Sequence, residues 1–125
     1  MEKQYSLKVE TEAFYLPEKS DLTGDRYVFG YRIRLTNTGT ERAQLVSRHW
    51  IITDANRQKQ EVRGMGVVGE HPDLAPGESY EYSSGVTLTT PWGTMHGSYQ
   101  MLAEDGTRFD ADIPEFVLTA PRVLH

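Results

Sequence analysis

The chain has 125 residues and no cysteine, which excludes disulfide scaffolds, cysteine nucleophiles and thiolate metal sites. Its 13 Lys and Arg stand against 18 Asp and Glu, and the resulting formal net charge of −5 disfavours binding to nucleic-acid phosphates. The most apolar stretch, residues 43–52, contains Arg48 and His49 and is shorter than the about 20 residues that a membrane-spanning helix needs. The first residues lack the apolar core of a signal peptide. We therefore expect one cytoplasmic domain over residues 1–125, with its core at about 5–118, that binds neither nucleic acid nor membrane.

Alternation of apolar and polar side chains is the strongest pattern along the chain. From Tyr27 to Leu35 an apolar residue occupies every odd position, and Arg32 and Arg34 lie between them. A strand points successive side chains to opposite faces of a sheet, so this spacing is typical of a strand with one buried face. The same pattern returns in residues 5–15, 99–103 and 109–113. We predict that most of the chain is extended.

The segment from residue 42 to residue 54 is apolar on both faces. Strict alternation would place Val46, Trp50 and Ile52 on one face, with Leu45 and His49 on the other. A strand that is apolar on both sides is typical of the centre of a sheet whose two faces are covered. We predict a central strand here, with its histidine satisfied inside the core.

Turn signals separate these runs, and no window predicts a helix. The signals are Asn37–Gly39, Asp54–Asn56, Ala75–Glu78 and Asp105–Gly106. About seven short strands with regular turn signals favour an all-β fold, a fibronectin type III or immunoglobulin-like sandwich of about seven antiparallel strands. Trp50 would then fill the space between the two sheets. An up-and-down barrel is the alternative, although the loop from Met65 to Pro76 is long for a simple meander.

Residues 64–69 match the string GxGxxG, in which Gly64, Gly66 and Gly69 are the glycines. In dinucleotide-binding proteins that string follows a buried strand and opens a helix whose N-terminus holds the phosphates. Here the preceding residues 59–63 are polar, and Pro72 and Pro76 follow within a few residues. Because proline breaks a helix, the context excludes that type of nucleotide site.

A glycine-rich turn can bind an anion without a helix, because successive backbone N–H groups form a nest. Arg57, Lys59 and Arg63 would add positive charge near such a nest, whereas Glu61 and Glu70 would oppose it. The other interpretation is a bulge or crossover between sheets, where glycine allows a bend or a close backbone approach. The sequence favours this structural interpretation over the nest.

The other polar groups give no catalytic pattern. Glu70 and His71, with Asp73, could hold a divalent cation, but a solvated polar loop is the favoured interpretation. Asp110 and Asp112 share one strand face, which is typical of the wet side of an antiparallel sheet. No serine lies in a nucleophile-elbow string. We predict no catalytic residues, no metal ligands and no cofactor, and a binding domain rather than an enzyme.

Five segments of the chain, in this order, resemble the ApaG family. They are Ser47–Asp54, Val62–Pro72, Leu74–Glu78, Gly93–Met101 and Ile113–Phe116, and the resemblance extends from about Tyr5 to Leu118. It implies a fibronectin-like sandwich in a bacterial cytoplasmic protein linked to cobalt and magnesium resistance. Eukaryotic F-box proteins carry the same domain, which implies an interaction module. A pyrophosphate site has been suggested for the family's glycine string.

Two functions from different classes follow. The first is a non-enzymatic domain that recognises a protein partner through exposed strands and the loop from Met65 to Pro76, with a link to cobalt and magnesium homeostasis. The alternative is a site for phosphate, pyrophosphate or another phosphate-containing ligand on the glycine segment, with or without a divalent cation. For either function the predicted binding residues are Arg63, Gly64, Gly66, Gly69, Glu70 and His71.

Overall fold

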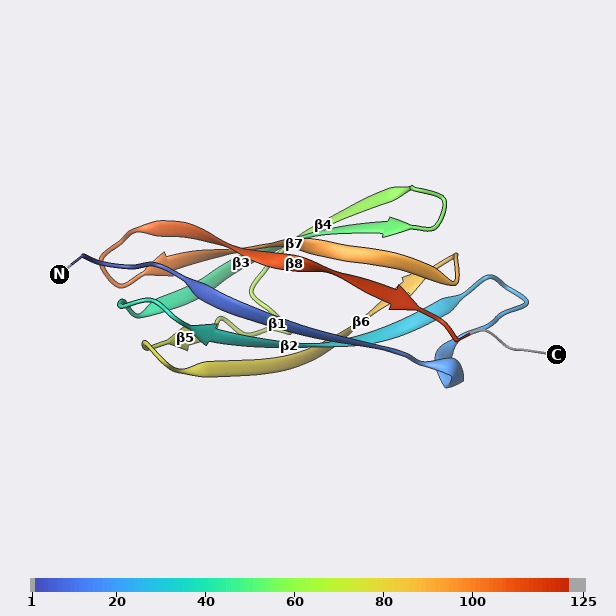
Figure 1. Cartoon of the computed structure of the whole chain (residues 1–125), viewed down its shortest axis with the longest axis horizontal. Coiled ribbons are helices and arrows are strands. Elements are labelled where there is room, and N and C mark those ends of the chain that lie inside the picture. The colour runs from blue at the N-terminus through green and yellow to red at the C-terminus, as the bar shows by residue number, and fades with distance from the viewer. Residues whose placement is uncertain (1, 122–125) are drawn as a thin grey trace.

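Two antiparallel sheets packed face to face make up residues 2–121, the part of the chain that the computed structural model describes (Figure 1). One sheet has the strand order β1-β2-β6, and its members are β1 (Leu7–Tyr15), β2 (Tyr27–Asn37) and β6 (Ser79–Leu88). The other sheet has the order β4-β3-β7-β8, and its members are β4 (Lys59–Met65), β3 (Ala43–Asp54), β7 (Trp92–Ala103) and β8 (Arg108–Thr119). The predicted all-β sandwich is confirmed.

Two short elements complete the description. The two-residue strand β5 (Asp73–Leu74) pairs with the start of β3 and belongs to the second sheet. A single turn of 3-10 helix, η1 (Pro17–Lys19), lies between β1 and β2. Within residues 2–121 we find no helix with the length and hydrophobicity that a bilayer crossing requires.

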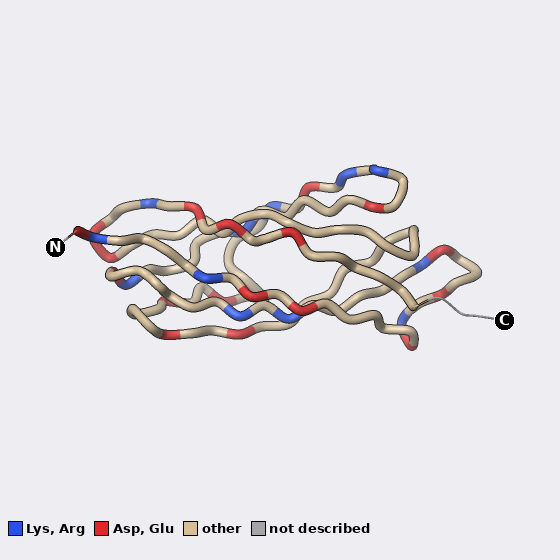
Figure 2. The backbone as a smooth tube through the Cα atoms, viewed as in Figure 1, with Lys and Arg blue, Asp and Glu red and all other residues tan. Residues whose placement is uncertain are grey.

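Strand β2 shows how the alternating sequence produces the layers. Its odd-numbered residues from Phe29 to Leu35 are buried between the sheets, whereas Tyr27 at the start of the strand is only half-buried. Arg32 points to the outer face, where its guanidinium lies 3.2 Å from Glu12 and 3.5 Å from Glu81 on the flanking strands. Figure 2 shows acidic and basic residues mixed along β1 and β2. Such exposed pairs add little stability, and they mark this face as solvated.

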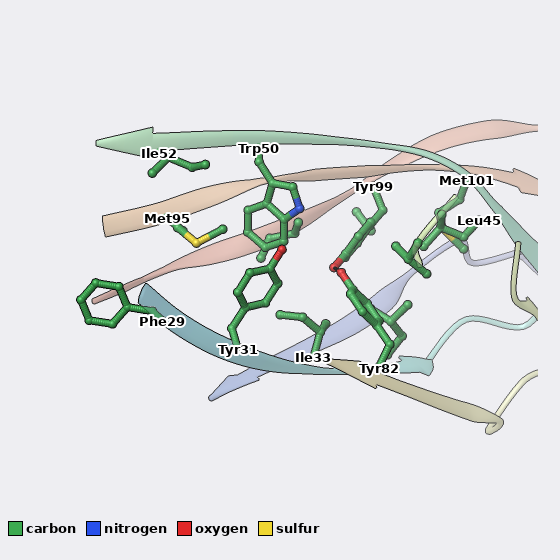
Figure 3. Packing of buried hydrophobic residues seen from close by; sticks show 14 of the residues in the cluster. Phe29, Tyr31, Ile33, Leu45, Trp50, Ile52, Tyr82, Met95, Tyr99 and Met101 are labelled. Carbon is green, nitrogen blue, oxygen red and sulfur yellow. Dashed lines mark hydrogen bonds between the residues drawn. The ribbon is translucent and has the colours of Figure 1, made fainter. Parts of the chain in front are cut away.

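Trp50 of β3 is the centre of the core, as the sequence predicts. Its indole, 2% exposed, lies against Tyr31 of β2 from the opposite sheet, with ring centroids 5.5 Å apart (Figure 3). The rings of Tyr99 and Phe116 meet it at 6.3 and 6.0 Å, and all three contacts are edge-to-face. Edge-to-face contacts between aromatic rings are favourable beyond the area that they bury. This cluster joins four strands from the two sheets.

The prediction for the two faces of β3 is wrong in part. The register against β7 shifts between Leu45 and Ser47, so Val46 forms a bulge. A bulge adds one residue and reverses the alternation beyond it, which returns Leu45 to the same inner face as Trp50. Leu45 is consequently fully buried. β3 is indeed central in its sheet, between β4 and β7.

His49 is not a core residue, contrary to the prediction. It lies on the outer face of the second sheet, and its Nε2 is 3.4 Å from the Glu61 carboxylate of β4. That face carries no further layer in the described chain (Figure 1). The histidine is half-buried by its neighbours on the same sheet rather than by a second sheet.

The sandwich is closed along one edge and open along the other. Strands β1 and β8 lie against each other, and the ring of Tyr5 packs on Phe109 at 5.9 Å. The Lys3 ammonium and the Tyr5 hydroxyl both donate to the Asp105 carboxylate in the β7–β8 hairpin. In the described chain β6 makes no comparable approach to β3 or β4. The first sheet has three strands and the second has four long ones, so β4 has no strand facing it.

One buried polar contact joins the two sheets. The hydroxyls of Tyr82 in β6 and Tyr99 in β7 are hydrogen-bonded at 2.5 Å (Figure 3). Burial raises the pKa of both phenols above the ordinary 10.0, because an ionised phenolate would lose its hydration there. The two hydroxyls therefore stay protonated in the folded protein at pH values where an unfolded chain ionises.

The burial of these two phenols predicts an alkaline loss of stability. Below about pH 10 both tyrosines are neutral in either state, whereas above it the unfolded chain loses protons first. Each phenol that stays protonated in the fold thus lowers the free energy of unfolding by about 1.4 kcal/mol at pH 11. In Tyr99→Phe the free energy of unfolding should decrease by about 1.4 kcal/mol less between pH 7 and pH 11 than in the wild type. At pH 7 the variant should be about 1 kcal/mol less stable than the wild type, because it lacks the hydrogen bond to Tyr82.

Urea unfolding at pH 7, 9, 10 and 11 measures both effects. Tyr80→Phe is the control, because its hydroxyl makes no hydrogen bond in the described chain. Equal alkaline slopes for wild type and Tyr99→Phe would contradict the assignment.

Candidate functional site

The glycine segment forms the end of β4 and a tight turn beyond it. Gly64 lies in β4. After the strand, the amides of Val67 and Glu70 each donate to the other residue's carbonyl, both at 2.8 Å. Between them φ is 43° at Val68 and 81° at Gly69. Positive φ at both central positions is the mark of a type I′ turn, the commonest tight connection of a β-hairpin.

This turn leaves few backbone donors for an anion. The amide of Gly66 donates to the carbonyl of Val46 at 2.9 Å, and the amides of Val67 and Glu70 are used by the carbonyls of Glu70 and Val67. Within the described chain the amides of Val68 and Gly69 are left without a main-chain acceptor. The carboxylate of Glu70 follows them directly. The geometry fits the structural interpretation of the glycines better than the phosphate nest.

Gly64 has a specific structural reason to lack a side chain. It pairs with Arg48 of β3, and a Cβ on Gly64 would stand 2.7 Å from three atoms of the Arg48 guanidinium. Above this glycine, Nη1 of Arg48 donates to the carbonyls of Met65 at 3.0 Å and Gly66 at 2.8 Å. Because Gly64 has no side chain, the Arg48 side chain can cross β4 and bind the carbonyls at the end of that strand.

The remaining predicted site residues point in different directions. Arg63 lies on the outer face of its sheet, 3.7 Å from the Glu61 carboxylate. Glu70 is exposed at the turn. The imidazole Nδ1 of His71 lies 3.1 Å from the carbonyl of Leu45, next to the bulge of β3. Of these three side chains, that of His71 contacts the rest of the fold, and the Arg63 side chain lies on the face of β4 opposite to the one where Arg48 crosses Gly64.

A slot runs along the open edge of the sandwich, between β6 on one side and β3 and β4 on the other. Its largest hollow measures about 380 Å³. The lining residues are Tyr31, Arg48, Trp50, Ile52, Gln60, Val62, Ser84, Gly85, Val86, Thr87 and Met95. The floor is aromatic and aliphatic, and Figure 3 shows Trp50, Tyr31 and Met95 from the two sheets meeting at this level.

The slot continues in both directions along β6. A hollow of about 140 Å³ extends it toward the type I′ turn and is lined by Val67, Val68 and Tyr82 as well as residues of the first hollow. A hollow of about 220 Å³ extends it toward Lys59 and Thr89. The shared lining residues make the three hollows one groove that follows β6 from Tyr82 to its end at Leu88 and reaches Thr89.

Strand β6 presents unpaired backbone groups beside this slot. Hydrogen bonds in an antiparallel pair involve every second residue. The amide of Asn37 donates to the carbonyl of Glu78, so the even-numbered residues of β6 face β2. The amides and carbonyls of Ser83, Gly85 and Thr87 therefore point away from β2, and none has a main-chain partner in the described chain.

Arg48 gives the slot its charge. It is the only charged residue among those lining the largest hollow, and its side chain is half-buried. One guanidinium nitrogen, Nη1, makes the two hydrogen bonds to the loop. Across residues 2–121 no carboxylate lies within ion-pair distance of this guanidinium. The largest hollow of the slot thus combines an apolar floor, a free strand edge and one cation that lacks an anionic partner in the described chain.

The slot was not predicted from the sequence, although one signal for it exists. Arg48, Trp50 and Ile52 are two positions apart along β3, and all three come after the bulge, so their side chains share the inner face. A charged residue on the inner face of a sandwich indicates an opening. No sequence pattern indicates the free edge of β6, because the order of strands in a sheet depends on contacts between residues far apart in the sequence.

Comparison with known proteins agrees with this fold. The family model for the ApaG domain matches residues 17–103. Among curated proteins, Protein ApaG of Chromobacterium violaceum is 62% identical over 99% of this chain and 98% of its own length. Protein ApaG of Nitrosospira multiformis is 61% identical, over 98% of this chain and 97% of its own.

The chain belongs to the ApaG family. A crystal structure of the ApaA protein of Bordetella pertussis superposes on this ApaG domain with a TM-score of 0.92 and 53% identity. That match covers 97% of this chain and 98% of the other. The architecture expected from the family resemblance is thereby confirmed.

The strained turn of this ApaG domain leads to a prediction. Val68 is β-branched and 55% exposed, yet its φ is 43°, a conformation that such residues rarely adopt. Asparagine tolerates that conformation, and Asn-Gly is the favoured pair in a type I′ turn. We expect Val68→Asn to raise the free energy of unfolding by about 1 kcal/mol.

Urea unfolding at pH 7 gives the measurement. Val117→Asn is the matched control, because Val117 is 59% exposed in the regular strand β8 and should lose a little stability. If Val68→Asn were no more stable than wild type, side-chain contacts of Val68 would outweigh the backbone strain.

Proposed function

We propose that this ApaG domain is a non-enzymatic binding module that takes an extended segment of another protein as an added strand beside β6. The observation that carries the proposal is the free edge of β6 at Ser83, Gly85 and Thr87, next to a slot with an apolar floor. An added strand satisfies the exposed amides and carbonyls of an edge, and alternate side chains enter the neighbouring pocket.

The unequal numbers of strands support the same position. The second sheet has four long strands and the first has three, so a strand added beside β6 would lie opposite β4. It would cover Val62, which is only half-buried, and the inner side of Gln60, which is exposed. Covering the Val62 side chain adds a hydrophobic contribution to the main-chain hydrogen bonds.

The expected partner is therefore a protein. We propose that the link to cobalt and magnesium homeostasis is indirect. Across residues 2–121 we find no group of three or more His, Asp or Glu side chains placed to hold a metal ion. We propose that any effect on these ions is exerted through the bound protein. The alternative ligand, pyrophosphate on the glycine segment, would meet the amides of Val68 and Gly69, which have no main-chain acceptor in the described chain, directly beside the Glu70 carboxylate.

A peptide-display experiment tests the strand addition. Random 12-residue peptides are selected on the immobilised domain, and the enriched peptides are titrated into ¹⁵N-labelled protein. We expect shifted and exchange-protected amides at Ser83, Gly85 and Thr87, because these are the amides that an added strand would pair.

A pair of variants isolates the backbone contribution. Thr87→Pro removes an N–H that points to the free edge, where proline is tolerated in a sheet, whereas Thr87→Ala removes the side chain and keeps that donor. We expect Thr87→Pro to weaken binding about tenfold and Thr87→Ala to leave it unchanged. Equal affinities for the two variants, or enriched peptides that leave the β6 amides unprotected, would refute strand addition.

A further inference from the structure

We infer that the segment bound in the slot carries an Asp or Glu side chain whose carboxylate meets Arg48. The inference rests on the proposed function and specifies the chemistry of its partner. It starts from the half-buried guanidinium on the inner face of β3, which has no carboxylate partner across residues 2–121. A cation that is partly removed from water gains strongly from a hydrogen-bonded carboxylate.

Arg48 has the donors to make that contact without leaving its present position. Nη1 donates to the carbonyls of Met65 and Gly66, and these two bonds fix the plane of the guanidinium over Gly64. A guanidinium has five N–H donors, so Nη2 and Nε stay available for a carboxylate. Because the loop already orients the side chain, little rotational freedom is lost on binding.

The lining of the slot gives the position of the carboxylate along the bound strand. Arg48 of β3 and Ser84 of β6 line both the largest hollow and the hollow near the type I′ turn, so they border the same part of the slot from different sheets. A carboxylate between them would meet the guanidinium, and the Ser84 hydroxyl would be a second donor. Side chains two positions apart on a strand share a face. The next inward residue would lie over Trp50 and Val86, which are apolar.

The expected recognition element is thus an acidic residue and an apolar residue with one residue between them. The groove continues beyond Arg48 in both directions, so an internal residue fits, and the carboxylate of a chain end is not required.

A second copy of this chain does not fit the charge requirement through its own β6. The inward side chains of that strand are Tyr80, Tyr82, Ser84, Val86 and Leu88, and none of them is acidic. Pairing of β6 with β6 of a second copy would therefore leave Arg48 without an anion. A partner that supplies a carboxylate is favoured for this reason.

The closing experiment uses an enriched peptide from the display selection, synthesised with an amidated C-terminus. Its acidic residue is kept in one form and replaced by Gln or Asn in the other, and Kd is measured by calorimetry for each. We expect the neutral peptide to bind about tenfold more weakly to the wild-type domain. We expect both peptides to bind Arg48→Gln with the same, weaker affinity.

Arg63→Gln is the matched control, because Arg63 lies one residue from Gly64 but on the opposite face of the sheet. Its affinities should equal those of wild type. Thermal unfolding checks that Arg48→Gln is folded, and Arg48→Lys, which keeps the charge but loses the planar fork, should restore part of the discrimination.

The outcomes separate the two proposals. Enriched peptides that leave β6 unprotected overturn the strand addition and this inference with it. If the peptides protect the β6 amides from exchange but the acidic peptide and its Gln or Asn form bind with equal Kd, only the inference about the carboxylate is overturned. Binding of 1 mM pyrophosphate that Arg48→Gln abolishes and that displaces the peptide would make a free anion the ligand of Arg48. Concentration-dependent dimers in sedimentation, lost in Thr87→Pro, would make a second copy the occupant.

Discussion

A charged guanidinium on the inner face of a β-sandwich cannot be enclosed by apolar side chains without a large desolvation cost. Arg48 is in this position, on the same face of β3 as Trp50. The structure meets the constraint in two ways. Gly64 gives the guanidinium a path to main-chain carbonyls at the edge of β4, and the two sheets stay apart on this side. The absence of a side chain at Gly64, the attachment of the loop to β3 and the charge in the largest hollow are all connected through this one residue.

The opposite edge of the molecule explains how the domain tolerates such an opening. There β1 lies on β8, and the N-terminal residues are attached to the β7–β8 hairpin through Asp105. The aromatic cluster around Trp50 and the hydroxyl bond between Tyr82 and Tyr99 span both sheets. The sandwich thus has a closed half that holds the two sheets together and an open half with unpaired backbone groups.

The fold was accessible from the sequence because alternation is a local property of strands. The odd positions of β2 and the Asp105–Gly106 hairpin, where Gly106 has a φ of 90°, were predicted correctly. The sequence pattern assigned Leu45 to the wrong face of β3, because the bulge at Val46 reverses the alternation of faces and no local sequence pattern indicates that bulge.

The candidate site was less accessible, because it depends on which strands are neighbours. The glycine string has a structural explanation in the fold: Gly64 accommodates Arg48, and Gly66 and Gly69 have positive φ before and within the tight turn. Arg63, the predicted cation, proved to lie on the outer face. The cation in the slot is Arg48, which the sequence pattern placed inside a run of apolar residues. Only the three-dimensional register distinguishes the two.

The edge of β6 has one more consequence, for the handling of the protein. Natural sheets usually guard an exposed edge with lysine, proline or a bulge, which keeps two molecules from joining edge to edge. Residues 83–87 read Ser-Ser-Gly-Val-Thr and contain none of these guards. Without a bound segment this edge can pair with the edge of another molecule, so concentrated solutions of the domain should aggregate. A peptide bound beside β6 should keep the domain in solution.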